Sequence, residues 1–256
     1  AVDASDRVAS TGSRLLSGHV GAWEKLEEGF SDYLGVEAAL FFNSGYAANT
    51  GLLTAIVRKQ DTVFSDAANH ASLIDGIRLS GCRKVIFPHL DLDFLEDALR
   101  GNDSREGERF IVVESIFSMD GDCAPIDELV TLSERYNAGL IVDEAHATGV
   151  VGPDGRGLIA TSGRSDAILA SIHTCGKALA ASGAFVAGSR TLKEYLANHA
   201  RPFIYTTGLP PYMTAQVAAG IKLGASARDE RTRLSKMSER LRVGLTDAGF
   251  DIGKSS

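Results

Sequence analysis

The chain has 256 residues, of which 44% are hydrophobic and 23% charged, with a formal net charge of -7 and a pI near 5.4. This composition predicts a soluble globular protein with one sizeable core, or a large core and part of a smaller domain. Phosphate contacts need concentrated Lys and Arg, so the acidic balance argues against a nucleic-acid partner. No apolar run approaches the roughly 20 residues that a membrane-spanning helix needs, so no membrane partner is expected.

The first residues, Ala1 to Arg7, lack the basic-then-apolar order of a signal peptide, which makes a cytoplasmic location the default expectation. The three cysteines, Cys82, Cys123 and Cys175, are widely spaced and odd in number. They form no Cys-x-x-Cys pair and have no histidines at metal-ligand spacing, which argues against a disulfide framework and a zinc site. We therefore predict reduced, packed thiols and no metal.

Short apolar runs alternate with amphipathic segments along most of the chain. Strands are predicted over residues 39–42, 62–64, 84–87, 110–113, 140–142, 167–172 and 184–187, because these runs are short and mostly rich in Val, Ile or Phe. Helices are predicted over residues 49–58, 70–80, 92–99 and 126–136, from their apolar periodicity. This alternation predicts an α/β fold with a mostly parallel, seven-stranded sheet flanked by helices.

The pattern changes beyond Pro202. Two prolines at 210–211 interrupt the chain, and residues 212–247 are almost continuously helix-compatible, with charges dense over 228–242. We expect a long helix that leaves the sheet domain, and we interpret its charges as a solvated face. The predicted divisions are an N-terminal segment and helix over 1–38, a large domain over 39–210, and a long helix leading to a truncated small domain over 211–256.

Lys177 stands in the run Ser171-Ile172-His173-Thr174-Cys175-Gly176-Lys177-Ala178, after an apolar strand and beyond Asp143 of Val142-Asp143-Glu144-Ala145-His146. A lysine amine can hold the aldehyde of pyridoxal 5'-phosphate (PLP) as a Schiff base. An aspartate at a strand end can keep the pyridine nitrogen protonated, so that the ring becomes an electron sink. A surface lysine and a turn-capping aspartate are the alternatives. Burial should lower the pKa of Lys177, so that the released amine can act as a base.

Ser44, Gly45 and Tyr46 lie between the strand over 39–42 and a helix expected to start near residue 48. Such a turn points free backbone N–H groups toward an anion, although any strand-to-helix turn can require a glycine. Together with the lysine and the aspartate, the turn predicts a phosphate cradle, with Thr174 as a second phosphate ligand. The Walker pattern of nucleotide-binding loops is absent.

Six motifs in one order carry a resemblance to a known family. They are Gly12-Ser13-Arg14-Leu15-Leu16-Ser17-Gly18, Asn43-Ser44-Gly45-Tyr46-Ala47-Ala48-Asn49, His70-Ala71-Ser72, Phe117-Ser118-Met119-Asp120-Gly121-Asp122, Asp143-Glu144-Ala145-His146-Ala147-Thr148-Gly149 and Thr174-Cys175-Gly176-Lys177. The chain resembles the α-oxoamine synthases over about residues 13–223. This resemblance implies the large domain of the PLP-dependent transferase fold type I.

The resemblance also implies roles for single residues. Lys177, His70 and Asp143 are the catalytic set, and His70 is expected to stack its ring on the pyridine face. His146 and Ser118 are expected beside the phenolic oxygen of the cofactor. The alternatives are a structural histidine for His146 and an ordinary helix-start residue for His70.

Thr206 and Thr207 belong to a segment, residues 205–211, that in the family reaches the phosphate of the neighbouring subunit. The resemblance therefore implies a homodimer with shared active sites. A turn before the Pro-Pro helix start is the alternative.

The resemblance implies an acyltransferase that condenses L-alanine with a pimeloyl thioester, on CoA or an acyl carrier protein, and releases carbon dioxide in biotin biosynthesis. Sister enzymes use glycine with acetyl-CoA or succinyl-CoA, or serine with a long acyl thioester, and the sequence does not separate these. Two further hypotheses are a catalytically silent partner subunit of the same fold and a nucleotide-binding α/β module.

The chain departs from the family in three respects. It starts almost at the Gly-Ser-Arg motif and stops soon after the predicted long helix, so we expect a fragment or missing segments. The family's C-terminal arginine, which receives the amino-acid carboxylate, has no matching position. Cys175 replaces an aromatic or other apolar residue, a change that we expect to be tolerated.

Overall fold

The computed structural model describes residues 8–102 and 107–255. Residues 1–7, which carry the signal-peptide argument and begin the predicted segment 1–38, lie outside the described residues. In the described part, seven strands form one sheet in the order β1-β7-β6-β5-β4-β2-β3. They are β1 (Ala38–Phe42), β2 (Thr62–Asp66), β3 (Arg83–Phe87), β4 (Arg109–Glu114), β5 (Ala138–Asp143), β6 (Ala170–Thr174) and β7 (Ala184–Gly188).

The sheet is mostly parallel, as the alternation of strands and helices predicts. The pairs β2–β3, β2–β4, β4–β5 and β5–β6 are parallel, whereas β7 is antiparallel to both β6 and β1. Each predicted strand is present. The sixth begins later than residue 167, because the N–H groups of Ala167 and Ile168 turn back to the carbonyls of Arg164 and Ser165 in a short 3-10 turn.

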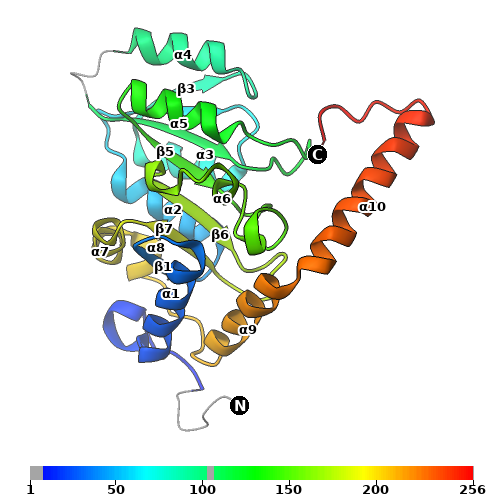
Figure 1. Cartoon of the computed structure of the whole chain (residues 1–256). Coiled ribbons are helices and arrows are strands. Elements are labelled where there is room, and N and C mark those ends of the chain that lie inside the picture. The colour runs from blue at the N-terminus through cyan, green and yellow to red at the C-terminus, as the bar shows by residue number, and fades with distance from the viewer. Residues whose placement is uncertain (1–7, 103–106, 256) are drawn as a thin grey trace.

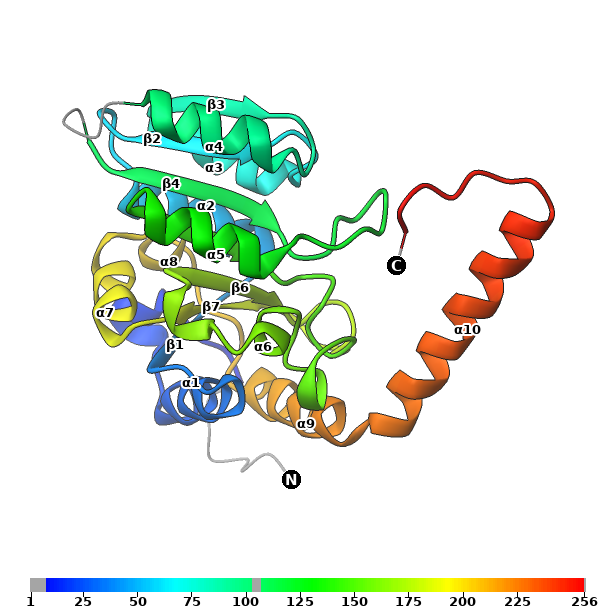
Figure 2. The same cartoon turned by 45° about the horizontal axis from the view of Figure 1, so that its top comes forward.

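Helices cover both faces of the sheet (Figures 1 and 2). They are α1 (Gly21–Leu34), α2 (Gly45–Ile56), α3 (Ala71–Ser80), α4 (Leu92–Gly101), α5 (Ile126–Arg135), α6 (Ile159–Ser162), α7 (Arg190–His199), α8 (Arg201–Ile204), α9 (Met213–Ser226) and α10 (Arg228–Asp247). On one face, α2, α3, α7 and α8 bury an apolar cluster against the strands. On the other face, α4 and α5 pack against one cluster, and α1 and α9 pack against another.

Two helix starts set the geometry of one sheet edge. Helix α2 begins at Gly45, earlier than the predicted start near residue 48, because the Ser44 side chain caps it by accepting the N–H of Ala47 at 3.1 Å. Helix α3 has His70 as its N-cap residue. The two helices approach closely at Gly76, where an added Cβ would lie 2.8 Å from a methyl carbon of Leu53.

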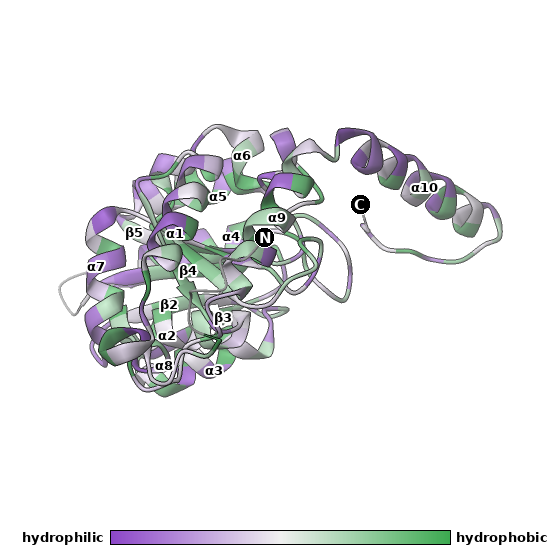
Figure 3. Ribbon diagram, turned by 90° about the horizontal axis from the view of Figure 1, so that it is seen from below, coloured by the Kyte–Doolittle hydropathy of each residue, from purple (hydrophilic) through white to green (hydrophobic). Residues whose placement is uncertain are grey.

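The expectation of one long helix over residues 212–247 is wrong, because the chain leaves the helical conformation at Ala227. Helix α9 ends there, and the Arg231 guanidinium donates to the terminal carbonyls of Gly224 and Ala225. Helix α9 lies against the sheet domain, whereas α10 projects away from it (Figure 1). No residue of α10 is buried, as expected for a solvated charged helix, and Figure 3 shows hydrophilic and hydrophobic residues along it.

Residues 8–102 and 107–255 contain no helix that is both long enough and apolar enough to cross a membrane. The predicted division of the chain at residues 38 and 210 stays a prediction.

Candidate active site

Polar side chains gather where the parallel strands end. Asp143 is the last residue of β5 and pairs in register with Glu114, the last residue of β4. Thr174 ends β6, and β1 runs in the same direction as β6 because both are antiparallel to β7. The N-terminus of α2 therefore opens at the same edge. The carboxyl edge of an open α/β sheet is the usual place for a ligand.

Lys177 reaches this edge from the turn after β6, and its Nζ lies 2.8 Å from Nε2 of His146. Burial, and secondarily the Lys177 charge, lower the pKa of His146. Because an ammonium group only donates, a neutral His146 accepts this hydrogen bond. The Lys177 side chain is exposed overall, yet partial desolvation lowers the pKa of its amine, against the opposing attraction of Asp143 and Glu114. This direction is the one expected for Lys177 from the sequence.

Asp143 is buried, with 4% of its surface exposed. Its Oδ2 accepts from Asn49 Nδ2 at 2.7 Å, and its Oδ1 accepts from the N–H of Ala145 at 2.9 Å. Burial raises the pKa of Asp143, while these two hydrogen bonds oppose the shift. The turn-capping alternative is thus real, but it occupies only one carboxylate oxygen. A buried carboxylate of this kind is stabilised by a cationic partner.

His70 is linked to Asp143 through two uncharged side chains. Its Nδ1 lies 2.8 Å from Ser72 Oγ, and Ser72 Oγ accepts from Asn49 Nδ2 at 2.8 Å. Asn49 therefore donates to both Ser72 and Asp143. Sequence reasoning missed Asn49 and Ser72 as functional residues. The available signal was an Asn in the apolar helix α2, where a polar side chain needs a partner.

Glu114 was also missed. It is 2% exposed, and its Oε1 has no hydrogen-bond partner among the described residues. Burial, followed by the nearby charge of Asp143, raises the pKa of Glu114 to about 7, although the backbone N–H of His70 donates to it. A glutamate directly after the apolar run 110–113 was the signal that could have identified it.

The predicted phosphate cradle is compact. An added Cβ at Gly45 would lie 3.6 Å from Thr174 Oγ1, so the first turn of α2 contacts the end of β6. The hydroxyl of Tyr46 donates to the Asp75 carboxylate, so the Tyr46 contribution to the predicted cradle is its backbone N–H and not its side chain. Ser44 caps the helix through its side chain.

Three predicted residues are not joined to this group. Ser118 lies in an exposed turn after β4, and Thr206 and Thr207 are exposed. Thr207 forms a bridge with Ser13, and its carbonyl accepts from Asn43 at 2.8 Å. Among the hydrogen bonds of the described residues, none connects these three side chains to Lys177.

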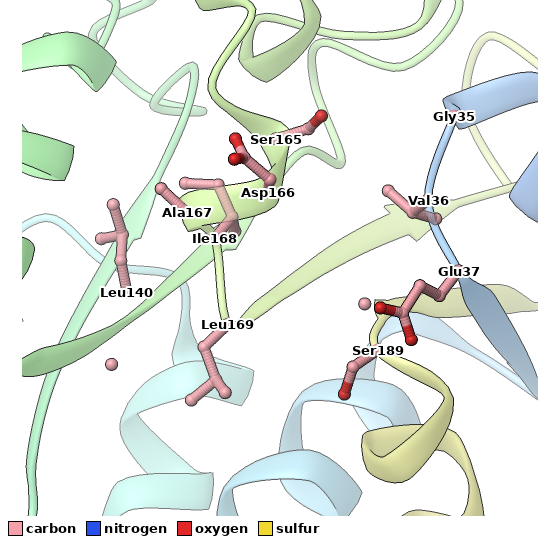
Figure 4. Close-up of a pocket in the computed structure, with 12 residues that line it drawn as sticks. Gly35, Val36, Glu37, Leu140, Ser165, Asp166, Ala167, Ile168, Leu169 and Ser189 are labelled. Atoms are coloured by element: carbon pink, nitrogen blue, oxygen red, sulfur yellow. The ribbon is translucent and has the colours of Figure 1, made fainter.

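The cavity in Figure 4, of about 430 Å³, lies at the opposite edge of the sheet. It is lined by residues 35–37 before β1, by the start of β5, by residues 165–169 before β6 and by the end of β7. None of the predicted site residues borders it, so the polar group at the carboxyl edge is the candidate active site.

A lysine, a buried aspartate and a helix N-terminus gather at the carboxyl edge of a mostly parallel α/β sheet. This is the arrangement predicted above for a PLP-dependent transferase of fold type I. The chain belongs to the aminotransferase class I and II family, which it matches over residues 1–256. It is 46% identical over 246 residues to 8-amino-7-oxononanoate synthase of Citrifermentans bemidjiense, covering 95% of this chain and 63% of that protein. It is 45% identical to the putative 8-amino-7-oxononanoate synthase of Bacillus licheniformis, covering 95% and 63%.

Two solved structures are also similar to this chain in fold and sequence. The 8-amino-7-oxononanoate synthase of Francisella tularensis is 30% identical with a TM-score of 0.82, covering 93% of this chain and 68% of that one. Serine palmitoyltransferase from S. paucimobilis, solved with a bound PLP-myriocin aldimine, is 32% identical with a TM-score of 0.91, covering 95% and 61%. The resemblance to the α-oxoamine synthases and the fold type I architecture are thereby confirmed. The chain spans a little under two thirds of the length of the curated relatives named above.

Proposed function

We propose that this chain is the PLP-binding part of an 8-amino-7-oxononanoate synthase, which condenses L-alanine with a pimeloyl thioester and releases carbon dioxide. The observation that carries the proposal is the convergence of Lys177, His146 and the buried Asp143 at one sheet edge. The names of the curated relatives support 8-amino-7-oxononanoate as the product.

The donor set fits PLP. It offers an amine for the aldehyde, a buried carboxylate for the pyridine nitrogen and a helix N-terminus beside Thr174 for the phosphate. When bound, PLP supplies an electron sink that stabilises negative charge at the Cα of the amino acid.

Lys177 anchors the cofactor and moves the Cα proton of the substrate. Desolvation lowers the pKa of its amine, which raises the neutral fraction that can act as a base near neutral pH. His146, whose Nε2 lies 2.8 Å from this amine, would form a hydrogen bond with the phenolic oxygen of PLP. Ser118 would supply a second hydrogen bond there.

Asp143 would keep the pyridine nitrogen of PLP protonated, and that cation would offset the cost of burying the carboxylate. Asn49 fixes the orientation of Asp143, and the Ser72 hydroxyl fixes the His70 ring, which would stack on the face of the cofactor. A ring in that place would exclude water from one side of the bound cofactor.

The backbone N–H groups of Gly45 and Tyr46 would hold the phosphate, with Ser44 and Thr174 beside them. Thr206 and Thr207 reach the phosphate of the neighbouring subunit, so the proposal includes a homodimer with shared sites. We also propose a cytoplasmic location for the protein. The exposure of both threonines in the single chain supports a contact made outside it.

The test is cofactor binding followed by substrate choice. The purified protein should turn yellow with PLP, and borohydride should fix the cofactor on Lys177. Lys177→Ala should abolish that fixation and turnover, whereas Lys59→Ala, at an exposed site, should preserve both. A colourless protein would refute the PLP role and favour a nucleotide-binding module, and a coloured protein without turnover would favour a silent partner subunit.

Alanine, glycine and serine should then be titrated separately with pimeloyl, acetyl, succinyl and palmitoyl thioesters. Product formation is expected with alanine and a pimeloyl thioester. The likeness to serine palmitoyltransferase makes serine with a long acyl thioester the second candidate. A response restricted to glycine or serine would overturn the alanine assignment.

A further inference from the structure

His89 lies outside the candidate active site and bridges two buried carboxylates. Its Nδ1 is 2.8 Å from Asp66 Oδ1, and its Nε2 is 2.9 Å from Asp122 Oδ2. Asp66 ends β2 and is 2% exposed, and Asp122 is 7% exposed. The Phe117 ring and the imidazole pack in a T-shaped arrangement, with ring centroids 4.4 Å apart and an interplanar angle of 82°.

The bridge requires an imidazolium. Neutral imidazole has one N–H donor, so only the protonated ring donates to both carboxylates. Burial opposes protonation, but the hydrogen bonds and charges of Asp66 and Asp122 together raise the pKa of His89. Asp66 is itself fixed, because its two oxygens accept the N–H groups of Ala68 at 2.8 Å and Leu90 at 2.9 Å.

Asp122 closes the turn that carries Ser118. The N–H of Phe117 donates to the Asp122 carbonyl at 3.0 Å, and the N–H of Gly121 donates to the Phe117 carbonyl at 2.9 Å. Ile116 and Cys123 form an isolated antiparallel β-bridge at the base of the turn. The segment between β4 and α5 projects from the carboxyl edge of the sheet (Figure 2). His89 therefore ties this projecting segment to the fixed end of β2.

We propose that His89 is a positioning residue, which through Asp66 and Asp122 holds the Ser118 turn in place for the cofactor. The proposal rests on the function proposed above for Ser118. Ser118, Met119 and Asp120 are exposed, so the tip of the turn has little packing of its own. A hydroxyl at such a tip needs an anchor at the base of the turn to meet a ligand at a defined place.

The first measurement is amide hydrogen exchange of the cofactor-free protein. His89→Gln should speed exchange over residues 116–124 by about tenfold or more while leaving β5 unchanged, because only the turn loses its anchor. Asp122→Asn, which keeps the shape of the side chain and removes its charge, should do the same. His199→Gln, on an exposed turn of α7, is the matched control and should leave the exchange unchanged.

The second measurement is the PLP dissociation constant together with the pH titration of the visible absorbance. His89→Gln and Ser118→Ala should each raise the dissociation constant, by about tenfold, and shift the titration in the same direction. The double variant should resemble Ser118→Ala alone, because His89 acts through Ser118.

Three results would overturn the positioning role: unchanged exchange over 116–124, faster exchange over β5 as well, or fully additive effects of the two substitutions. If the wild-type protein binds no PLP, the proposed function fails and the role of His89 toward the cofactor fails with it. The exchange measurement still decides separately whether His89 holds the turn.

Discussion

At the scale of residues, uncharged side chains hold the charged groups of the site in place. Lys177 and Asp143 could be predicted because each has a local sequence signal, a lysine after an apolar strand and an aspartate at a strand end. Asn49 could not, because its partner Asp143 is 94 positions away in the chain. Only the packing of α2 against the sheet brings the two together.

Asn49→Ala should weaken PLP binding by about tenfold, because Asp143 Oδ2 loses its side-chain donor and the buried carboxylate is left less well oriented and solvated. PLP titration by visible absorbance measures this effect. Asn198→Ala removes an exposed amide that bonds within α7 and serves as the control. Equal PLP affinity of the Asn49 variant and the wild type would contradict the role of Asn49.

Glu114→Gln should change the pH dependence of stability of the cofactor-free protein. The folded-state pKa of Glu114 is raised to about 7 from 4.5, so folding favours its protonated form. This contribution is present below about pH 4.5 and is lost as the pH rises through 7. Gln is neutral throughout, so the variant should gain thermal stability relative to the wild type between pH 5 and 8.

Thermal unfolding of the cofactor-free Glu114 variant should be followed at several pH values. Glu108→Gln, at an exposed position, should follow the wild-type profile. A difference between the Glu114 variant and the wild type that does not change with pH would show that the carboxyl group does not titrate as described.

At the scale of elements, the strands were predicted well and the helix ends less well. Short apolar runs between polar segments are strong local signals for buried strands, and all seven are present. The start of α2 at Gly45 depends on a cap made by the Ser44 side chain, and the break at Ala227 depends on Arg231 meeting the end of α9. Both are side-chain contacts that periodicity does not describe.

Ser44→Ala should destabilise the cofactor-free protein by about 1 kcal/mol, because the N–H of Ala47 loses its cap, and Ser44→Gly should cost less. Ser189→Ala is a matched control, since Ser189 caps α7 by accepting the N–H of Leu192 at 3.1 Å. Chemical denaturation should show similar losses for both alanine variants. PLP affinity should fall only for the Ser44 variant, and an equal fall for both would contradict the phosphate role.

At the scale of the whole molecule, the two edges of the sheet differ. The carboxyl edge carries the lysine, the carboxylates and the helix N-terminus, whereas the opposite edge carries the cavity of Figure 4. Among the described residues, no hydrogen bond joins the side chains of Thr206 and Thr207 to Lys177, and the proposed dimer would bring these exposed side chains to the site of the partner. The cavity of Figure 4 borders none of the predicted site residues, so the case for the carboxyl edge rests on the chemistry of its side chains and not on concavity.

Shared active sites predict complementation between inactive variants. Lys177→Ala and a Thr206→Ala/Thr207→Ala double variant should each be nearly inactive. After they are mixed and allowed to exchange subunits, half of the dimers should be mixed, with one intact site each. Activity should therefore rise to about a quarter of the wild-type value. Mixing without subunit exchange is the control, and no gain after confirmed exchange would show that the threonines do not act across the interface.

The sequence by itself determined the class of fold and the order of the strands along the chain, and it indicated Lys177 and Asp143 as candidate cofactor residues. These are recorded in local periodicity and in motif order. Only the tertiary structure decided which side chains touch: His146 with Lys177, Asn49 with Asp143, and His89 with Asp66 and Asp122. Such contacts join segments far apart in the chain, and they follow from the packing of helices on a twisted sheet rather than from any local pattern.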